Sequence, residues 1–486
     1  MQLASWRLPL LRLVRLYTFT SSTPQKTAYL IGIKGAGMTA LAQVYAGRGI
    51  RVSGSDTSQR FYTDDVLRRA GISFVEHFAT ENIPADTDLV VRSTAYDADH
   101  VEVAEALRRG LRVLTYPEAI AEVFNAGKGI AICGTHGKST TTAMLGWVLA
   151  EAGLDPTVIV GAEVPQFGGN ARIGQSDIVV LEADEYQDKL QYLKPQGVIL
   201  TSIEYDHPDF FSTPEAYADV FRRFVARIPA DGFLVTCVDD GGALEVAKEA
   251  SCEVIAYGFN NLSQFRTKLR KAPEEITLKI PGRHNIQNAL GVLATAEQLG
   301  VSRDVALRAL ASFQGTRRRF ETVGEVGGIT VIDDYGHHPT EIRVTLAAAR
   351  ERFSSRRILC AFHAHTFTRT IALKDTFATA FVSADRTYVM DIFGSAREQL
   401  PHFSPSHREG ELEGVGPSRN GSVAHNITSD LVAAIHTNSP ATASGNVEQT
   451  VEALLRDVRP GDVVICMGAG ENDRVARLLV ERLRVR

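Results

Sequence analysis

The segment at residues 128–153, KGIAICGTHGKSTTTAMLGWVLAEAG, constrains the fold more than any other part of the chain. Its apolar start predicts a strand over 129–133, and the pattern that follows predicts a helix over 140–152, closed by Gly153. A strand that passes through a tight glycine turn directly into a helix is typical of parallel β–α–β units. We therefore expect parallel sheets covered by helices, the α/β class.

The turn inside this segment has the chemistry of a phosphate-binding loop. Gly134 and Gly137 let backbone N–H groups approach a phosphate, and the start of the helix adds partial positive charge. Lys138 can reach a terminal phosphate, and the Ser139 hydroxyl can ligate Mg²⁺. The loop is shorter than the pattern G-x-x-x-x-G-K-[ST], which would place a glycine at Ile132. A turn without a ligand is the alternative, but the flanking strand and helix favour nucleotide binding.

The strand–turn–helix theme recurs along a chain of 486 residues, a length that predicts about three domains. Copies lie at residues 27–49 and 356–370, and apolar strands ending in polar residues lie at 88–95, 176–185, 196–207 and 462–473. A glycine-containing linker at 125–129 and a basic one at 312–321 separate the units. The predicted division is an extension at 1–26 and domains at 27–124, 125–314 and 315–486.

Composition excludes several classes of protein. A net charge of −5 argues against nucleic acid as a partner, and no apolar run approaches the ~20 residues of a membrane span. Five cysteines without a C-x-x-C pair favour buried free thiols in a reducing cytoplasm. The Arg-rich start, residues 1–22, has the composition of a transit peptide, but we favour a simple extension or a short surface helix. Residues 404–426, rich in Gly, Ser and Pro, are predicted to form a mobile surface loop.

Carboxylates and a histidine follow two of the predicted strands, at the sheet edge where ligands gather. In EADEY and EYDH they are Glu182, Asp184, Glu185, Glu204, Asp206 and His207. Above a phosphate loop, such groups are suitable Mg²⁺ ligands. Solvated charge is the alternative for any single residue, but two acidic strand ends after one G-K-S loop favour a metal.

The first glycine turn, GIKGAGM, is weaker evidence for a ligand. It lacks G-x-G-x-x-G because Lys34 stands where the second glycine would be. Asp56 follows about 20 residues on, where a dinucleotide-binding fold places its ribose-binding acid. The turn predicts nucleotide or diphosphate binding, with a nicotinamide-dependent oxidoreductase as an alternative that we do not favour.

Two later segments add polar groups whose role the residues alone leave open. Asn285 and Asn288 share one face at the start of a predicted helix, although capping would also explain Asn285. DDYGHHPTE and HAHTFTRT supply side chains that suit metal ligation, proton transfer or a hydrogen-bonded loop. These are Asp333, Asp334, His337, His338, His363, His365 and Arg369. A Cys/His zinc site is not expected, because no cysteine falls at ligand spacing.

Taken in order, the motifs resemble the Mur ligase family, and its alanine-adding branch in particular. They are GIKGAGM, SGSD, GTHGKST, EADE, EYDH, PGRHNIQNAL, RRRFE, DDYGHHPTE, HTFTRT, DIFGSARE and GAGEND. The resemblance implies an N-terminal Rossmann-like domain for a UDP-sugar, a central P-loop ATPase-type domain with a parallel sheet, and a C-terminal Rossmann-like domain for the amino acid. It implies ATP-dependent joining of L-alanine to UDP-N-acetylmuramate through an acyl phosphate, with Mg²⁺, in peptidoglycan synthesis in the cytoplasm. No nucleic acid or membrane partner is implied, and the chain would be a monomer or homodimer.

The resemblance also implies roles for single residues. Catalysis would use Lys138, His207, His338 and Arg369, with Arg369 pairing with the alanine carboxylate. ATP would contact Gly134, Thr135, His136, Gly137, Lys138, Ser139, Thr140, Asn285, Asn288, Asp334 and Tyr335. The UDP-sugar would contact Gly35, Ala36, Gly37, Met38, Ser55, Asp56, His77, Ser93 and Thr94. Mg²⁺ would be held by Ser139, Glu182 and His207.

Some features depart from the alanine-adding pattern. Ser139 replaces a threonine but keeps the hydroxyl, and Lys34 places a charge near the expected diphosphate, where it would either help or crowd binding. Arg222 and Arg223 stand where other branches carry a carbamylated lysine, which agrees with the alanine-adding branch. EADEY is similar to the branch that attaches a whole tripeptide. A tripeptide-recycling ligase is therefore the first alternative, and a non-ligase ATPase the second.

Overall fold

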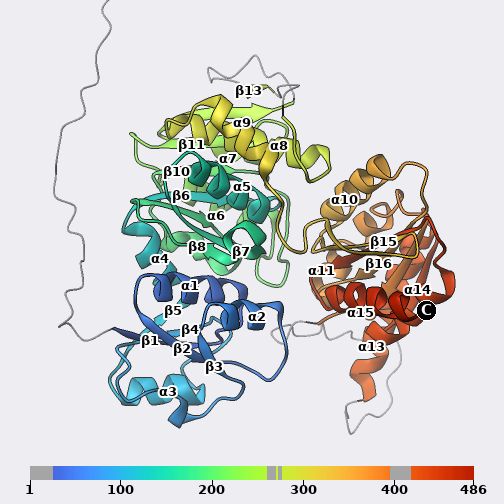
Figure 1. Ribbon diagram of the computed structural model, residues 1–486, viewed down its shortest axis with the longest axis horizontal. Helices are drawn as coiled ribbons and strands as arrows, with labels where there is room; N and C mark the ends of the chain where they lie inside the picture. The colour runs from blue at the N-terminus through green and yellow to red at the C-terminus, as the bar shows by residue number, and fades with distance from the viewer. Residues whose placement is uncertain (1–25, 260–269, 272–275, 395–417) are drawn as a thin grey trace, which may run out of the picture.

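The computed structural model describes residues 26–259, 270–271, 276–394 and 418–486, arranged as three lobes (Figure 1). Each lobe is built on its own mainly parallel sheet flanked by helices, as the recurring strand–turn–helix theme predicts. The α/β prediction is confirmed, whereas the domain boundaries drawn from the linkers remain a prediction. The extension at 1–26 lies outside the described residues except for Lys26, and none of the described helices is long and apolar enough to cross a membrane.

The first sheet is entirely parallel, in the order β3-β2-β1-β4-β5. Its strands are β1 (Thr27–Ile31), β2 (Arg51–Ser55), β3 (Ser73–Val75), β4 (Leu89–Arg92) and β5 (Arg112–Thr115). Its helices are α1 (Ala36–Gly47), α2 (Tyr62–Arg69), α3 (Val101–Arg108) and α4 (Tyr116–Asn125), with a short 3-10 turn η1 (Thr80–Asn82). α1 follows β1 directly, so the predicted glycine turn lies at the carboxyl edge of this sheet.

The middle sheet has the order β13-β12-β11-β10-β6-β9-β7-β8, and only the β7–β8 pair is antiparallel. Its strands are β6 (Lys128–Cys133), β7 (Thr157–Val164), β8 (Gly169–Arg172), β9 (Ile178–Glu182), β10 (Gly197–Leu200), β11 (Phe233–Cys237), β12 (Glu253–Gly258) and β13 (Arg270–Lys271). Its helices are α5 (Lys138–Glu151), α6 (Pro214–Val225), α7 (Gly241–Ala247), α8 (Arg283–Gln298) and α9 (Arg303–Ser312), with 3-10 turns η2 (Pro165–Phe167) and η3 (Tyr186–Tyr192). β6 pairs with both β9 and β10, so the phosphate loop stands between the two acidic strand ends.

The third sheet has the order β14-β15-β19-β16-β17-β18, with β14 antiparallel to β15. Its strands are β14 (Glu321–Val326), β15 (Ile329–Asp334), β16 (Ile358–His363), β17 (Arg386–Met390), β18 (Ala441–Gly445) and β19 (Val463–Gly468). Its helices are α10 (Pro339–Arg352), α11 (Phe367–Ala372), α12 (Lys374–Ala378), α13 (Ser418–His436), α14 (Val447–Asp457) and α15 (Asn472–Val485). The prediction of a loop over 404–426 is wrong for residues 418–426, which belong to α13, and residues 404–417 lie outside the described part of the chain.

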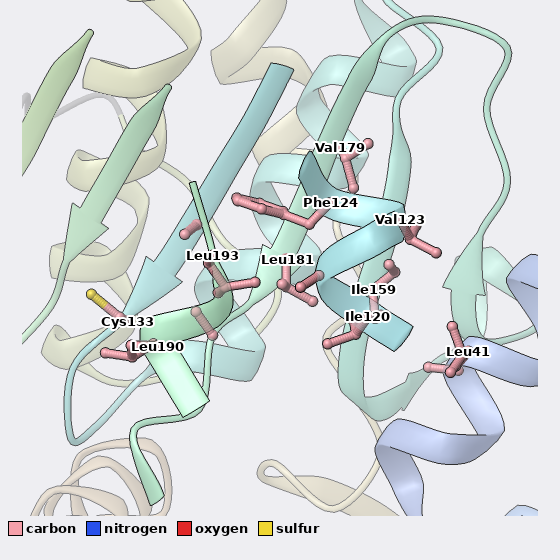
Figure 2. Packing of buried hydrophobic residues seen from close by; sticks show 14 of the residues in the cluster. Leu41, Ile120, Val123, Phe124, Cys133, Ile159, Val179, Leu181, Leu190 and Leu193 are labelled. Atoms are coloured by element: carbon pink, nitrogen blue, oxygen red, sulfur yellow. The ribbon is translucent and has the colours of Figure 1, made fainter. Parts of the chain in front are cut away.

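The core joins the first lobe to the middle one. Leu41 of α1 and Phe124 of α4 belong to the same apolar cluster as Ile159 and Leu181 of the middle sheet (Figure 2). Burying side chains of this size stabilises the contact by about 1.5–3 kcal/mol each. The cysteines are free thiols, and four of the five are buried within strands or at their ends, as predicted.

Candidate active site

The phosphate loop can form only with glycine at its two predicted positions. Gly134 has φ +122° and Gly137 has φ +80°, values that L side chains rarely adopt. A Cβ on Gly134 would lie 2.7 Å from the backbone oxygen of Ser202, and one on Gly137 would lie 2.7 Å from Asn288 Oδ1. α5 begins at Lys138, immediately after this loop, so its free N–H groups face the space above β6. The loop is complete although its first glycine is two residues later than the common pattern has it.

Lys138 is held at the mouth of the loop by a buried carboxylate. Its Nζ donates to Glu185 Oε2 at 2.9 Å and to the carbonyl oxygen of Gly134 at 2.5 Å. Glu185 is fully buried and also accepts a hydrogen bond from the Tyr217 hydroxyl at 3.0 Å. Burial works to lower the pKa of Lys138, but Glu185 and Asp184 outweigh it and raise the pKa. The ammonium therefore stays charged beside the loop, where phosphate oxygens can take the place of Glu185.

Two of the three predicted Mg²⁺ ligands lie together. Ser139 Oγ donates to Glu182 Oε1 at 2.7 Å, and Glu182 Oε2 accepts the Gly161 N–H at 2.6 Å. The hydroxyl and carboxylate oxygens are donors that Mg²⁺ prefers, so this pair fits the ion. His207 lies at the neighbouring strand end, with Nε2 3.8 Å from Glu185 Oε1, and it has φ +56°. Its contacts join it to Glu185 rather than to the Ser139–Glu182 pair.

A cavity between the middle and third lobes gathers many of the predicted ATP contacts. Its lining includes His136, Gly137, Thr140, Asn285, Asn288 and Asp334 from the predicted set. Asp239, Gln287 and Arg319 also line it, and sequence reasoning did not single them out. Tyr335 lies beside the cavity rather than in its lining, with the guanidinium groups of Arg318 and Arg319 about 5 Å from its ring.

A partly buried polar cluster ties the phosphate loop to the third lobe. His136 Nε2 lies 2.9 Å from Glu204 Oε2, and its Nδ1 lies 3.3 Å from Glu341 Oε1 of α10. Thr340 Oγ1, also in α10, donates to Glu204 Oε1 at 2.9 Å. Burial works to lower the pKa of His136, but the bonds to Glu204 and Glu341 raise it to about 9. Glu341 is not identified from the sequence as a site residue, because no local pattern indicates its contact with His136.

His338 caps α10 within the same cluster. Its Nδ1 accepts the Thr340 N–H at 3.3 Å, and its ring centroid lies 4.8 Å from that of His136. The residue is 1% exposed. α10 begins at Pro339, directly after this cap.

Arg369 reaches from α11 across to the middle lobe. Its Nε donates to Asp206 Oδ1 at 2.8 Å, and both side chains are buried. Burial works to raise the pKa of Asp206, but Arg369 lowers it far below its usual range. His337 and His365 pack nearby, and burial together with Arg369 lowers their pKa to about 3 and about 4. Arg369 is thus the charged group among neutral imidazoles, and the carboxylate that it binds here is that of Asp206.

The predicted UDP-sugar residues lie along the carboxyl edge of the first sheet, but two of them already have partners. Ser55 Oγ donates to Glu102 Oε2, and Asp56 Oδ2 accepts the Lys34 N–H at 2.7 Å. Ser93 stands against Gly32 in the first glycine turn, while His77 lies beyond β3. The remaining members, Gly35, Ala36, Gly37, Met38 and Thr94, lie at the start of α1 and after β4.

Lys34 neither assists nor crowds a diphosphate at this edge. Its side chain is fully buried, with Nζ 2.7 Å from Glu76 Oε1 and 3.4 Å from Asp64 Oδ2. The Nζ also donates to the carbonyl oxygen of Thr57 at 3.0 Å. The ammonium therefore stabilises the loop after β2. It makes these contacts away from the glycine turn, so only backbone groups of the turn face the sheet edge.

Comparison with known proteins agrees with this geometry. Models of the Mur ligase family match at residues 27–128 (Mur ligase family, catalytic domain), 132–296 (Mur ligase middle domain) and 318–470 (Mur ligase, glutamate ligase domain). The chain belongs to the Mur ligase family. A UDP-N-acetylmuramate–L-alanine ligase of Desulfitobacterium hafniense is 37% identical over 93% of this chain and 99% of its own.

Other similar proteins include two further alanine ligases and a murein peptide ligase. The UDP-N-acetylmuramate–L-alanine ligase of Renibacterium salmoninarum is 37% identical over 94% of this chain and 95% of its own. The crystal structure of a UDP-N-acetylmuramate-alanine ligase from Thermotoga maritima is 26% identical, with a TM-score of 0.75 over 94% of this chain and 99% of that one. A murein peptide ligase from Psychrobacter arcticus shares the fold, with a TM-score of 0.70 over 94% of this chain and 98% of that one at 24% identity.

Proposed function

We propose that this chain joins L-alanine to UDP-N-acetylmuramate while converting ATP to ADP and phosphate. The observation that carries the proposal is the 37% identity to ligases of that name along 93% of the chain. The phosphate loop, with Lys138 and the Ser139–Glu182 pair, supplies the groups that such a reaction needs. The first domain is assigned to the UDP-sugar, the middle one to ATP and the third to alanine.

The chemistry requires a carboxylate to attack a phosphate that repels it. Lys138 stays charged beside the loop and would bind the γ-phosphate oxygens in place of Glu185, which reduces that repulsion. Ser139 Oγ and Glu182 would hold Mg²⁺, which would add positive charge at the same phosphate. Attack by the lactyl carboxylate of the sugar gives an acyl phosphate and releases ADP.

The amine of alanine must then meet this acyl phosphate. Arg369 would orient alanine through its carboxylate, because it is the buried cation among the neutral rings of His337 and His365. Asp206 holds one edge of the guanidinium at Nε, so alanine would bind through the nitrogens that Asp206 leaves available or would displace it. Attack of the amine on the carbonyl carbon forms the amide and releases phosphate.

One assay distinguishes this proposal from a tripeptide ligase and from an ATPase without ligase activity. The chain is incubated with ATP, Mg²⁺ and UDP-N-acetylmuramate, then with L-alanine or with the murein tripeptide, while phosphate release and product mass are followed. We expect release that depends on L-alanine and a product heavier than the sugar by one alanyl residue. Release that depends on the tripeptide instead, or that needs no amine, would overturn the proposal.

A further inference from the structure

Three side chains with metal-ligand chemistry converge where the phosphate loop meets the third lobe. They are His136 of the loop, Glu204 after β10 and His338 at the start of α10, and one ligand atom from each lies within 4.8 Å of the others. None of the three is in the predicted magnesium set of Ser139, Glu182 and His207. The cluster is therefore a second place where a cation can be held.

The ligand atoms are already oriented by neighbouring groups. His136 directs Nδ1 at Glu341 Oε1, 3.3 Å away, and Nε2 at Glu204 Oε2, 2.9 Å away. An ion bound at Nε2 takes the place of the proton between these two atoms, and that proton is released to the solvent. Thr340 occupies the other oxygen of Glu204 at 2.9 Å. A histidine held by a carboxylate behind it, and a carboxylate held by a hydroxyl, are the supports that metal ligands usually have.

His338 completes the set through Nδ1. This atom lies 3.9 Å from Glu204 Oε2. It accepts the Thr340 N–H, so it is unprotonated and its lone pair is directed at that N–H. In that tautomer Nε2 carries the hydrogen, and Nε2 has no hydrogen-bond partner among the described residues. Ligation through Nδ1 would need no change of tautomer, only exchange of one long capping bond.

We propose that His136 Nε2, Glu204 Oε2 and His338 Nδ1 form a binding site for Zn²⁺ or a similar transition-metal ion between the middle and third lobes. Two nitrogens and one oxygen suit Zn²⁺, Co²⁺ or Ni²⁺ and do not suit Mg²⁺, which prefers oxygen ligands. Tetrahedral bonds of 2.0–2.1 Å place ligand atoms about 3.3 Å apart. The two distances to Glu204 Oε2 are 2.9 and 3.9 Å, and separations within the cluster extend to 4.8 Å, so the side chains must move closer together to bind an ion.

The site couples the metal to the nucleotide cavity and to the contact between lobes. His136, Glu204, Thr340 and Glu341 all line that cavity, and His136 lies within the phosphate loop itself. An ion bound to residues of both lobes stabilises their contact by its binding free energy. The inference uses no substrate and stands or falls independently of the ligase assignment.

The test measures metal binding directly on the full chain without a polyhistidine tag, in excess Mg²⁺. Equilibrium dialysis against Co²⁺ or Zn²⁺ is expected to retain a single ion per chain, and the Co²⁺ form is expected to show visible d–d absorption without thiolate charge transfer. The Glu204→Gln and His338→Gln variants are expected to weaken binding by about 10-fold or more, in line with the loss of a ligand. His337→Gln, which changes the adjacent histidine, is expected to bind as the parent does.

Thermal unfolding supplies a second readout in case a variant folds poorly. Zn²⁺ is expected to raise the unfolding midpoint of the parent and of His337→Gln, and to leave that of Glu204→Gln unchanged. Absence of stoichiometric binding would show that hydrogen bonds alone hold the three side chains together. Undiminished binding in both site variants, or a thiolate band, would place the ion elsewhere. Each of these outcomes overturns the proposal.

Discussion

At the scale of single residues, the site is defined by which charge each cation faces. Lys138 faces Glu185, Arg369 faces Asp206, and His136 faces Glu204. The first two pairs lie largely out of water, where an unpaired charge would be unfavourable, whereas Glu204 of the third is 39% exposed. A substrate that brings its own negative charge can therefore exchange with a protein carboxylate without leaving the cation unpaired.

Replacing Lys138 by alanine is expected to lower kcat by at least ~10²–10³, because the cation aimed at the transferred phosphate is lost. Binding of UDP-N-acetylmuramate, assigned to the first lobe, is expected to stay within about 2-fold. Phosphate release and calorimetric titration with the UDP-sugar provide the two measurements. Lys128→Ala is the control, since Lys128 lies at the far end of β6 and makes only an exposed pair with Asp177. Equal loss of sugar binding and turnover would contradict the assignment of domains.

Burial of the His284 ring predicts that the free energy of unfolding falls in acid. Burial lowers its pKa from 6.5 to about 4, so the folded chain disfavours the charged ring. The folded state binds fewer protons than the unfolded state between these values, so the contribution is full above pH 6.5 and is lost as the pH falls toward 4. Thermal unfolding of the parent and of His284→Gln across this range measures it. We expect a shallower fall in the variant, and parallel curves would contradict the inference.

At the scale of elements, the sequence predicts the ends of strands and the starts of helices more accurately than the contacts between them. The strand before Gly134 and the helix after it follow from apolar runs and glycine turns, which are local signals. The Ser139–Glu182 pair also follows, because parallel strands deliver their carboxyl ends to one edge. The His136–Glu341 contact joins residues 205 apart, and no periodicity reports such a distance.

The glycine turn before α5 gives a prediction at this scale. Gly134→Ala is expected to destabilise the chain more than Gly153→Ala, although both glycines have positive φ. An alanine at either position carries the left-handed strain of about 1–2 kcal/mol. At Gly134 the new Cβ also meets the Ser202 backbone, whereas at Gly153 nothing lies within 4 Å. Denaturant unfolding of the two variants checks this, and equal losses would show that the crowding at Gly134 is relieved without cost.

At the scale of the whole molecule, function depends on how the third lobe meets the middle one. The sequence established three α/β units and placed most site residues at strand ends, but it could not show which carboxylate each cation would find across the lobes. Arg369 illustrates the difference, because its motif suggested a substrate carboxylate and the structure supplies Asp206. Lys34 illustrates it again, since its partners Asp64, in α2, and Glu76, after β3, both lie outside the glycine motif.

The Arg369–Asp206 pair therefore links amino-acid binding to the contact between lobes. Arg369→Ala is expected to raise the KM for alanine by about 10-fold or more, and far more than the KM for ATP, because a charge-assisted bond to the carboxylate is lost. It also leaves the buried Asp206 without its arginine partner, at about 3–5 kcal/mol, so the lobes are expected to separate. Small-angle scattering should then report a larger radius of gyration for the variant.

Arg350→Ala is the matched control, because Arg350 pairs with Asp385 within the third lobe and makes no described contact with the middle one. Asp206→Ala separates the two roles of the pair: it removes this one contact between the lobes but keeps the cation for alanine. If both Arg369→Ala and Asp206→Ala enlarge the molecule, and only Arg369→Ala weakens alanine far more than ATP, then Arg369 serves both substrate and closure. Equal changes in the two KM values for Arg369→Ala would show that Arg369 only stabilises the contact between the lobes. The alanine carboxylate would then bind another cation near Arg369.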